Sequence, residues 1–140
     1  MGTDIKGIPD SVKVIPSTRH GLVLVSGAYR GRNFLHVAYN IWQARKVSRF
    51  LWDNGVPNIC PHLNSALMPE KDDRFLHGYL EMVHRVDALA MVPGWEGSVG
   101  AVQEFLLAQK LRLPTFINAL DSCVEWHRER MKGLACHASE

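Results

Sequence analysis

Short apolar runs alternate with segments of helical periodicity along this chain, and that alternation restricts the fold more than any other feature of the sequence. The runs lie at residues 21–27 (GLVLVSG), 56–60 (VPNIC), 88–92 (ALAMV) and 113–117 (LPTFI). A short apolar run bounded by small or turn-forming residues is typical of a strand that is covered on both faces. Each run is therefore predicted to be a strand, and the runs at 21–27 and 88–92 are predicted to be buried.

The segments between these runs carry apolar residues at helical spacing. Helices are predicted at residues 34–52, around the stripe Phe75, Tyr79, Met82, Val83 and Val86, and at residues 98–110. Asp72 or Asp73 is placed to cap the second helix, and SCVE at residues 122–125 has the spacing of a capping box that opens a C-terminal helix. Residues 61–73 (PHLNSALMPEKDD) are predicted to form a loop.

Strands that alternate with helices predict an α/β fold with a parallel sheet, right-handed crossovers and helices on both faces. We expect four to five strands and a single domain, because 140 residues is a common size for one hydrophobic core. The chain is divided into an N-terminal lead (1–20), the domain itself (21–120), and a C-terminal helix and tail (121–140).

Charge and hydropathy exclude several classes of protein. A formal net charge of +2 is too small for a nucleic-acid polymer binder, and the basic segment at residues 43–49 (QARKVSR) lies in a predicted helix as a solvated face. No apolar run approaches the ~18 residues of a membrane span, and no signal sequence is recognised, so a cytoplasmic location is expected. Three cysteines fit reduced thiols better than a disulfide framework.

The C-terminal segment allows a second interpretation, as a zinc site made by Cys123, His127, Cys136 and His137. Cys123 and His127 lie one helical turn apart, but the other two residues are adjacent in the tail. An ordinary surface helix explains the same residues, and we expect neither a metal nor a cofactor.

Ligands of parallel sheets bind at the carboxyl ends of the strands, and this rule brings together three loops, at residues 26–33, 61–73 and 93–97. The first loop (SGAYRGRN) combines two glycines with Arg30 and Arg32 directly before a helix. Helix-start amides and guanidinium groups both bind phosphate, so the loop is a candidate anion site. The alternative is a glycine-rich turn whose arginines are only solvated.

The third loop (PGWEGSVG) places Ser98 and the amides of Val99 and Gly100 at a second helix start, so that two helix starts are predicted to face one cleft. Glu104 follows six residues after Ser98, on the side of the helix that carries Gly100 and Ala101. These small residues leave room for a substrate against the carboxylate. Alternatively, the glutamate only favours the helix dipole.

Four segments are more specific than these patterns: SGAYRG, AYNIWQA, CPHLNSA and RVDALAMVPGWEGSVGAVQEFLLAQKLRLPTF. Together they resemble the nucleoside 2-deoxyribosyltransferase superfamily, and within it the phage and bacterial group named domain of unknown function 4406. The resemblance covers residues 22–117, and its most specific part is LPGWExSxGAxxE, matched at residues 92–104. It implies a Rossmann-like sheet and cleavage or exchange of the N-glycosidic bond of nucleosides or their 5'-monophosphates by a glutamate nucleophile.

The resemblance also implies roles for single residues. Glu104 matches the nucleophile, and Ser98 matches the residue that holds the sugar 5'-hydroxyl or 5'-phosphate. Arg30 and Arg32 fall where phosphate-binding members keep an arginine. The chain departs from the pattern at Tyr79, where many relatives have an aspartate. Tyr79 is our candidate for the acid that protonates the departing base. The alternative is that Tyr79 only packs in the core and that Asp72 or Asp73 supplies the proton.

The remaining predicted substrate-binding residues come from all three loops and the helix that follows. They are Ser26, Gly27, Tyr29, His62, Asn64, Trp95 and Gly100. Trp95 is suited to stack on a nucleobase or to cover a subunit contact, and His62 is suited to contact the base or to support a neighbouring loop.

We therefore expect an N-glycosidase or deoxyribosyltransferase that acts on a nucleoside 5'-monophosphate through a covalent glycosyl-Glu104 intermediate. A nucleotide-binding module of the same fold without turnover is the alternative, followed by a structural or interaction protein. The expected partner is a small nucleotide or nucleoside. The relatives also imply a homodimer or a multiple of it, for which four tryptophans are available: Trp42, Trp52, Trp95 and Trp126.

Overall fold

The computed structural model describes residues 21–66, 68 and 73–137 and contains one four-stranded sheet. The strands are β1 (Val23–Ser26), β2 (Asn58–Ile59), β3 (Ala88–Met91) and β4 (Thr115–Ile117). They lie in the order β2-β1-β3-β4, and every neighbouring pair is parallel. The predicted α/β class with a parallel sheet is confirmed, with four strands among the described residues.

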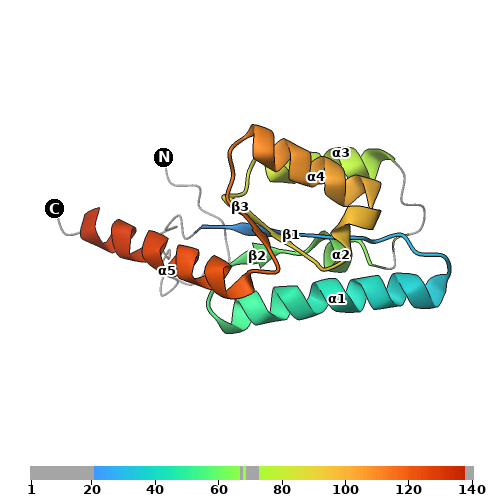
Figure 1. The fold of residues 1–140 in the computed structure, drawn as a ribbon, viewed down its shortest axis with the longest axis horizontal. Helices are drawn as coiled ribbons and strands as arrows, with labels where there is room; N and C mark the ends of the chain where they lie inside the picture. Colours follow the sequence, from blue (N-terminus) through green and yellow to red (C-terminus); the bar gives the residue numbers. More distant parts are fainter. Residues whose placement is uncertain (1–20, 67, 69–72, 138–140) are drawn as a thin grey trace, which may run out of the picture.

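Helices cover both faces of this sheet, as expected for parallel strands joined by crossovers. The helices are α1 (Phe34–Asp53), α2 (Pro61–Asn64), α3 (Asp73–Val83), α4 (Val99–Lys110) and α5 (Leu120–His137), with a 3-10 turn, η1 (Trp95–Gly97), before α4. In Figure 1, α3 and α4 lie on one face of the sheet, and α1 and α5 lie on the other.

The core has two halves because successive side chains of a strand point to opposite faces. Val23 and Val25 of β1 pack with Leu51 of α1 and Cys123 of α5. Leu24, between them in the strand, packs on the other side among residues from α3 and α4. Ser26 is two residues beyond Leu24, so its side chain points to the α4 side of the sheet.

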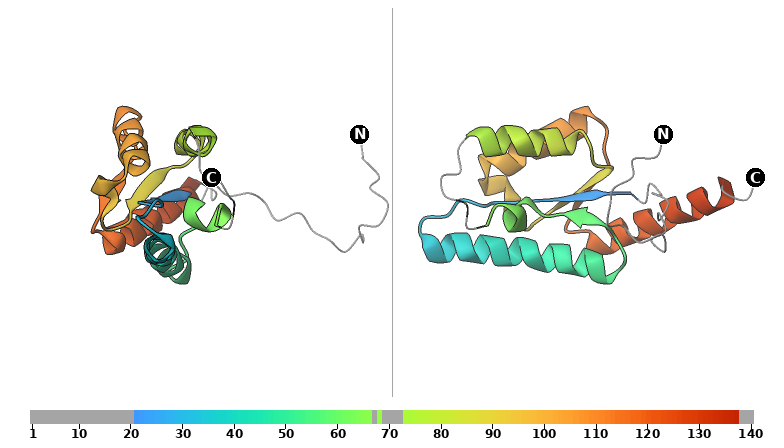
Figure 2. Two further views of the ribbon diagram at one scale, coloured as in Figure 1. Left: turned by 90° about the vertical axis from the view of Figure 1, so that its right-hand side faces the viewer. Right: turned by 180° about the vertical axis from the view of Figure 1, so that it is seen from behind.

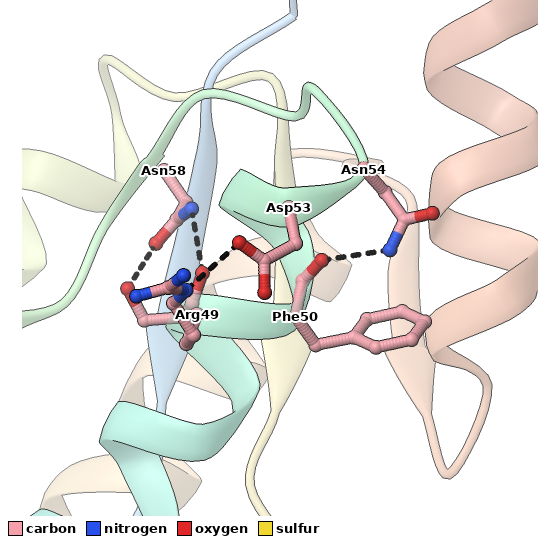
Figure 3. Close-up of polar contacts among 6 residues, drawn as sticks. Arg49, Phe50, Asp53, Asn54 and Asn58 are labelled. Atoms are coloured by element: carbon pink, nitrogen blue, oxygen red, sulfur yellow. Dashed lines mark hydrogen bonds and ion pairs between the residues drawn. The ribbon is translucent and has the colours of Figure 1, made fainter.

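Polar contacts attach the end of α1 to β2 (Figure 3). Ser48 Oγ donates a hydrogen bond to Asn58 Oδ1 (2.7 Å), and Asn58 Nδ2 donates to the carbonyl oxygen of Ser48 (3.2 Å). Nearby, Asn54 Nδ2 donates to the carbonyl of Phe50, and Arg49 pairs with Asp53 on the exposed surface. Both Ser48 and Asn58 are buried, so this reciprocal pair satisfies polar groups that water does not reach.

Several predicted boundaries were wrong. Strand β2 has two residues, where 56–60 was predicted, because Pro57 has no backbone N–H and Pro61 already begins α2. The segment predicted as a loop at 61–73 therefore starts with a short helix, favoured by proline in its first turn. The predicted capping box at residues 122–125 lies inside α5, which begins two residues earlier, at Leu120.

The other helix predictions agree more closely. Asp73 is the first residue of α3, whereas Asp72, the other predicted cap, lies outside the described residues, as do residues 1–20. Val86, predicted on the stripe of α3, follows the end of that helix and is nevertheless buried in the core. Along the described residues, no helix is both long and apolar enough to cross a membrane.

The last helix is attached at the amino ends of the strands. Asp87, directly before β3, accepts a hydrogen bond from the backbone N–H of Leu22 (2.8 Å) and one from the guanidinium of Arg130 in α5 (3.1 Å). Cys123 and Val124, in the first turns of α5, belong to the same core as β1. Figure 2 shows the rest of α5 projecting beyond the sheet. The opposite end of the sheet remains open for a site.

Candidate functional site

A pocket of about 370 Å³ lies at the carboxyl ends of β1 and β2, beside the start of α4. It is lined from the loop after β1, from α2 and the segment that follows, from α3 and from α4. The lining residues are Val25, Gly27, Tyr29, Arg30, Pro61, His62, Ser65, Asp73, Phe75, Leu76, Tyr79, Gly97, Ser98, Val99, Gly100, Ala101 and Glu104. The three loops predicted to converge at this edge of the sheet do contribute to one pocket.

Glu104 is the most deeply placed charged group of this pocket. It is in the second turn of α4, only 6% exposed, and Ser26 Oγ at the end of β1 donates a hydrogen bond to Glu104 Oε2 across 78 residues of sequence. Ala101, one turn before Glu104, is a small residue that also lines the pocket. The local sequence therefore leaves space beside the carboxyl group, as predicted.

Burial determines the ionisation of this carboxyl group. Desolvation raises the pKa of Glu104 from its ordinary value of 4.5 to about 7, and the hydrogen bond from Ser26 acts in the opposite direction because it stabilises the charged form. Near neutral pH, Glu104 is therefore divided between carboxylate and carboxylic acid. A pKa shifted in this way, in a pocket, is typical of a functional carboxyl group.

The start of α4 forms one wall of the pocket. Ser98 is its N-cap and accepts a hydrogen bond from the backbone N–H of Ala101 (3.3 Å). Gly97, Val99 and Gly100 line the pocket beside it. First-turn amides of a helix have no partners within the helix and attract anions, so this wall suits a negatively charged group.

The glycines of the first loop are required by packing within the protein. A Cβ on Gly27 would lie 2.6 Å from Cβ of Val92, and a Cβ on Gly31 would lie 2.7 Å from Cβ of His36. No real side chain tolerates such distances. The glycines thus let the loop pass close to β3 and α1, a different reason from the close ligand approach that the sequence suggested.

Asn40 holds the same loop in place and was missed by the sequence analysis. It is buried on α1, and its Nδ2 donates to the backbone carbonyls of Tyr29 (3.3 Å) and Arg30 (3.0 Å). A polar residue on the buried side of a predicted helix was the available signal. Because the two carbonyls are fixed, the side chains of Tyr29 and Arg30 leave the loop at defined points of the pocket wall.

His62 also supports this loop. It is buried, its ring lies 5.8 Å from the ring of Tyr29, and its Nε2 contacts the carbonyl oxygen of Ala28 at 2.9 Å. Burial lowers the pKa of His62 below its ordinary value, so the ring is neutral at pH 7. A carbonyl can only accept, so Nε2 carries the hydrogen, and of the two predicted roles the contacts favour support of a neighbouring loop.

Tyr79, the predicted acid, has its hydroxyl in a small hydrogen-bond network with Ser65, a pocket residue that the sequence analysis did not select. The two hydroxyls are hydrogen-bonded to each other, and both reach the carbonyl oxygen of Pro61, at 2.9 Å from Ser65 Oγ and 3.4 Å from Tyr79. That carbonyl only accepts, so whichever hydroxyl is the donor between the two, both protons are used inside the network.

Burial also makes the phenol of Tyr79 hold its proton more tightly. Burial raises the pKa of Tyr79 above its ordinary value, and the hydrogen bond with Ser65 opposes that effect. The tyrosine is therefore neutral at pH 7, and the network offers lone pairs to a ligand more readily than protons.

Four residues predicted to bind substrate do not line the pocket. They are Ser26, Arg32, Asn64 and Trp95. Ser26 is buried behind Glu104 and is only 1% exposed. Trp95 packs on Phe105, with ring centroids 4.7 Å apart, because η1 turns it toward the core on the α4 side. Asn64 is exposed at the end of α2.

Arg32 precedes α1, and the start of that helix does not line the pocket either. The backbone N–H of Arg32 donates to His36 Nδ1 (3.1 Å), and the side chain of Asn33 caps the helix. The loop carries the chain past the pocket before α1 begins, so one of the two predicted helix starts, that of α4, faces the cleft.

The side chain of His137, one of the four residues of the alternative zinc site, lies outside the described part of the chain. Cys123 and His127 are buried in α5, whereas Cys136 is exposed. Among the side chains that the structure describes, at residues 21–66, 68 and 73–136, no three histidine, cysteine, aspartate or glutamate residues come together as metal ligands.

A family model matches the central part of the chain, which includes part of the site. Residues 55–117 match the model of a family described as Domain of unknown function (DUF4406). This match runs from β2 to β4 and includes Tyr79, Ser98 and Glu104, whereas β1 and its loop precede it. No curated protein and no solved structure matches the chain.

Proposed function

We propose that the protein cleaves the N-glycosidic bond of a nucleoside 5'-monophosphate and that Glu104 is the nucleophile. The observation that carries this proposal is a buried carboxyl group at the base of a 370 Å³ pocket, hydrogen-bonded at one oxygen and raised to a pKa of about 7. A nucleoside monophosphate is compatible with a pocket of this size. The resemblance to the nucleoside 2-deoxyribosyltransferase superfamily supports the same reaction.

The chemistry takes two steps. The Glu104 carboxylate attacks the anomeric carbon, the bond from that carbon to the base nitrogen breaks, and the bonding electron pair leaves with the base, which takes a proton from an acid. Water or a second base then loses a proton to the conjugate base of that acid and attacks the same carbon, the ester bond to Glu104 breaks, and both the carboxylate and the acid are restored. Two displacements on one carbon retain its configuration, as in retaining glycosidases.

Asp73 is the carboxyl group that we assign to proton transfer to the departing base. It lies in the first turn of α3 and lines the pocket, where Asp73 and Glu104 are the carboxyl side chains found among the described residues. Tyr79, our candidate from the sequence, fits this role less well because its proton is held in the network with Ser65 and the carbonyl of Pro61.

The 5'-phosphate fits the wall formed by Arg30 and the start of α4. Arg30, Ser98, Val99 and Gly100 all line the pocket. A guanidinium group and helix-start amides together provide charge-assisted hydrogen bonds of the kind that select a phosphate over a hydroxyl. The expected ligand is therefore the monophosphate rather than the free nucleoside.

The decisive experiment measures base release. The protein is incubated with a panel of ribo- and deoxyribonucleoside 5'-monophosphates, and released base is separated by chromatography. A substrate should be turned over by the wild type, and Glu104→Gln should lower that rate at least ~10³-fold, because the amide is not a nucleophile. Intact-protein mass spectrometry should detect a glycosyl adduct on the wild type alone. Turnover by Glu104→Gln near the wild-type rate would remove Glu104 from the mechanism.

A nucleotide-binding module without turnover is the second candidate. The Tyr79 network favours it, because the Tyr79 hydroxyl is engaged with Ser65 and the carbonyl of Pro61 at a position where many members of the superfamily have an aspartate. In that case no monophosphate releases base, yet nucleotides raise the melting temperature of the protein by stabilising its folded state. A panel that produces neither effect would leave the third class, a structural or interaction protein.

A further inference from the structure

Ser26 occupies a fixed point behind the pocket. It is the last residue of β1, its carbonyl accepts a hydrogen bond from the backbone N–H of Val92 (2.7 Å), and it pairs in register with Met91 of β3. The alternation of β1 turns its side chain toward α4. The next residue, Gly27, allows β1 to stay this close to Val92. The Ser26 hydroxyl is therefore held by the sheet itself.

A ligand in the pocket does not reach this hydroxyl. Ser26 is 1% exposed and is not part of the pocket lining, so the substrate-binding role expected from the sequence does not fit its position. The partner that its hydroxyl does reach is Oε2 of Glu104.

The two oxygens of Glu104 are consequently different. Oε2 accepts the hydrogen bond from Ser26. Oε1 makes no hydrogen bond to the described part of the chain, and it is not one of the side-chain atoms sealed from solvent without a partner. Since Glu104 lines the pocket, Oε1 is the oxygen that faces it.

We infer that Ser26 is a positioning residue: its hydroxyl holds Oε2 of Glu104, so that Oε1 is the oxygen presented to the anomeric carbon. This inference rests on the proposed function for the identity of the reacting carbon. The hydrogen bond itself does not depend on a substrate. It fixes the rotation of the carboxyl group, and a carboxylate already oriented for attack loses less freedom on reaching the transition state.

The same hydrogen bond also controls the charge of the nucleophile. A hydroxyl that donates to a carboxylate stabilises the charged form, which is the direction in which Ser26 acts on the pKa of Glu104. Without Ser26, burial alone would remain, and a larger fraction of Glu104 would be protonated and unreactive at neutral pH.

The test is a titration of Glu104 in protein labelled with carbon-13 at the glutamate side-chain carboxyl, with the signal assigned by its absence in Glu104→Gln. The wild-type signal should titrate near pH 7. In Ser26→Ala the midpoint should rise by about one to two pH units, the size expected for loss of a hydrogen bond to a charged group. An unchanged midpoint in a folded Ser26→Ala protein would overturn the inference.

Two further variants make the result specific. Ser26→Cys nearly preserves the size of the side chain but donates weakly, so its midpoint should also rise, and it replaces Ser26→Ala if that variant does not fold. Ser48→Ala removes another buried serine, one that bonds Asn58 in the other layer, and should leave the Glu104 midpoint unchanged. A shift of equal size in Ser48→Ala would mean that the titration reports general loosening, and the inference would fail.

The outcome is separable from that of the proposed function. A raised midpoint in Ser26→Ala without base release from any nucleotide would support the positioning role and reject the reaction. If the wild type does release base, the pH at which Ser26→Ala reaches half of its maximal rate should rise together with its titration midpoint. A rate profile that stays at the wild-type pH would contradict the positioning role.

Discussion

Tyr79 of α3 and Ser65, which follows α2, are hydrogen-bonded to each other, and both hydroxyls lie within hydrogen-bond distance of the carbonyl oxygen of Pro61. The pair joins two walls of the pocket, and the resemblance to the proposed superfamily implies an aspartate in many relatives at the position of Tyr79. Whether the phenol or a carboxyl group supplies the proton is therefore the first point to test.

Tyr79→Phe should change turnover little. Because the proton of Tyr79 is already held within the network, its removal should lower the rate of base release by less than ~10-fold, whereas loss of a true general acid costs ~10²-fold or more. The free energy of unfolding should fall by about 1 kcal/mol, the usual contribution of one hydrogen bond. Steady-state kinetics and urea unfolding measure the two effects, and a 100-fold slower enzyme with unchanged stability would restore Tyr79 as the acid.

Asp73→Asn should show the opposite pattern. This residue is exposed in the first turn of α3, so the substitution should alter stability by less than about 1 kcal/mol. The rate of base release should nevertheless fall by at least ~10²-fold, because the amide has no acidic proton to give to the departing base. Glu81→Gln, an exposed carboxyl on the same helix outside the pocket, is the matched control. Equal rates for both variants would exclude Asp73.

The central part of this site could be predicted from the sequence because βα units place their functional groups in a regular way. Parallel strands put the loops that follow them at one edge of the sheet, and the N-cap at Ser98 fixes the phase of α4. Once that phase is known, Glu104 has to fall one to two turns into the helix, on the side of Gly100 and Ala101. Local pattern was sufficient for those residues.

The rest depended on contacts between segments far apart in the chain. Nothing local indicates that Ser65 meets Tyr79, or that Asn40 on α1 reaches the carbonyls of the first loop. The direction of an aromatic side chain in a loop is not predictable either, and Trp95 packs on Phe105 and does not line the pocket. The path of the first loop, which carries Arg32 away from the cleft, is likewise set by packing.

We propose that the exposed apolar face of α1 mediates self-association. Leu35, Tyr39 and Trp42 follow one another at helical spacing and are exposed by 76%, 53% and 50%. Trp95 and Trp126 pack against the core, which leaves Trp42 and Trp52 as the tryptophans available for an interface. We expect a homodimer by sedimentation velocity, and Leu35→Asp combined with Trp42→Asp should make it monomeric. Leu134→Asp, on the exposed side of α5, should not, and a wild-type monomer at high concentration would exclude the interface.

Arg30→Ala should remove most of the preference for a 5'-phosphate. If Arg30 and the start of α4 bind that group, the monophosphate should bind better than the nucleoside by roughly 2 to 4 kcal/mol in calorimetry. Arg30→Ala should weaken monophosphate binding by at least ~10-fold and leave nucleoside binding unchanged. Arg32→Ala is the matched control, because Arg32 lies two residues away but outside the pocket lining. Equal affinity of the wild type for nucleoside and monophosphate would contradict the phosphate site.

The raised pKa of Glu104 predicts how the stability of the protein depends on pH. An unfolded glutamate loses its proton near the ordinary value of 4.5, whereas folded Glu104 keeps it up to about pH 7. Between these values the folded state binds the additional proton, so the stabilisation from protonated Glu104 is complete below pH 4.5 and is lost as the pH rises through 7. At about 1.4 kcal/mol for each pKa unit, the complete loss is about 3.5 kcal/mol.

Glu104→Gln carries no such proton, and it should therefore gain stability relative to the wild type as the pH rises. The difference in the free energy of unfolding between the variant and the wild type, measured by urea denaturation, should move in favour of the variant by about 3 kcal/mol between pH 4.5 and pH 8. Glu96→Gln, an exposed glutamate before α4, is the control in which water already solvates the charge. A Glu104→Gln difference that stays constant across this range would mean that the folded protein does not penalise the Glu104 carboxylate, and the desolvation that we assign to the nucleophile would be absent.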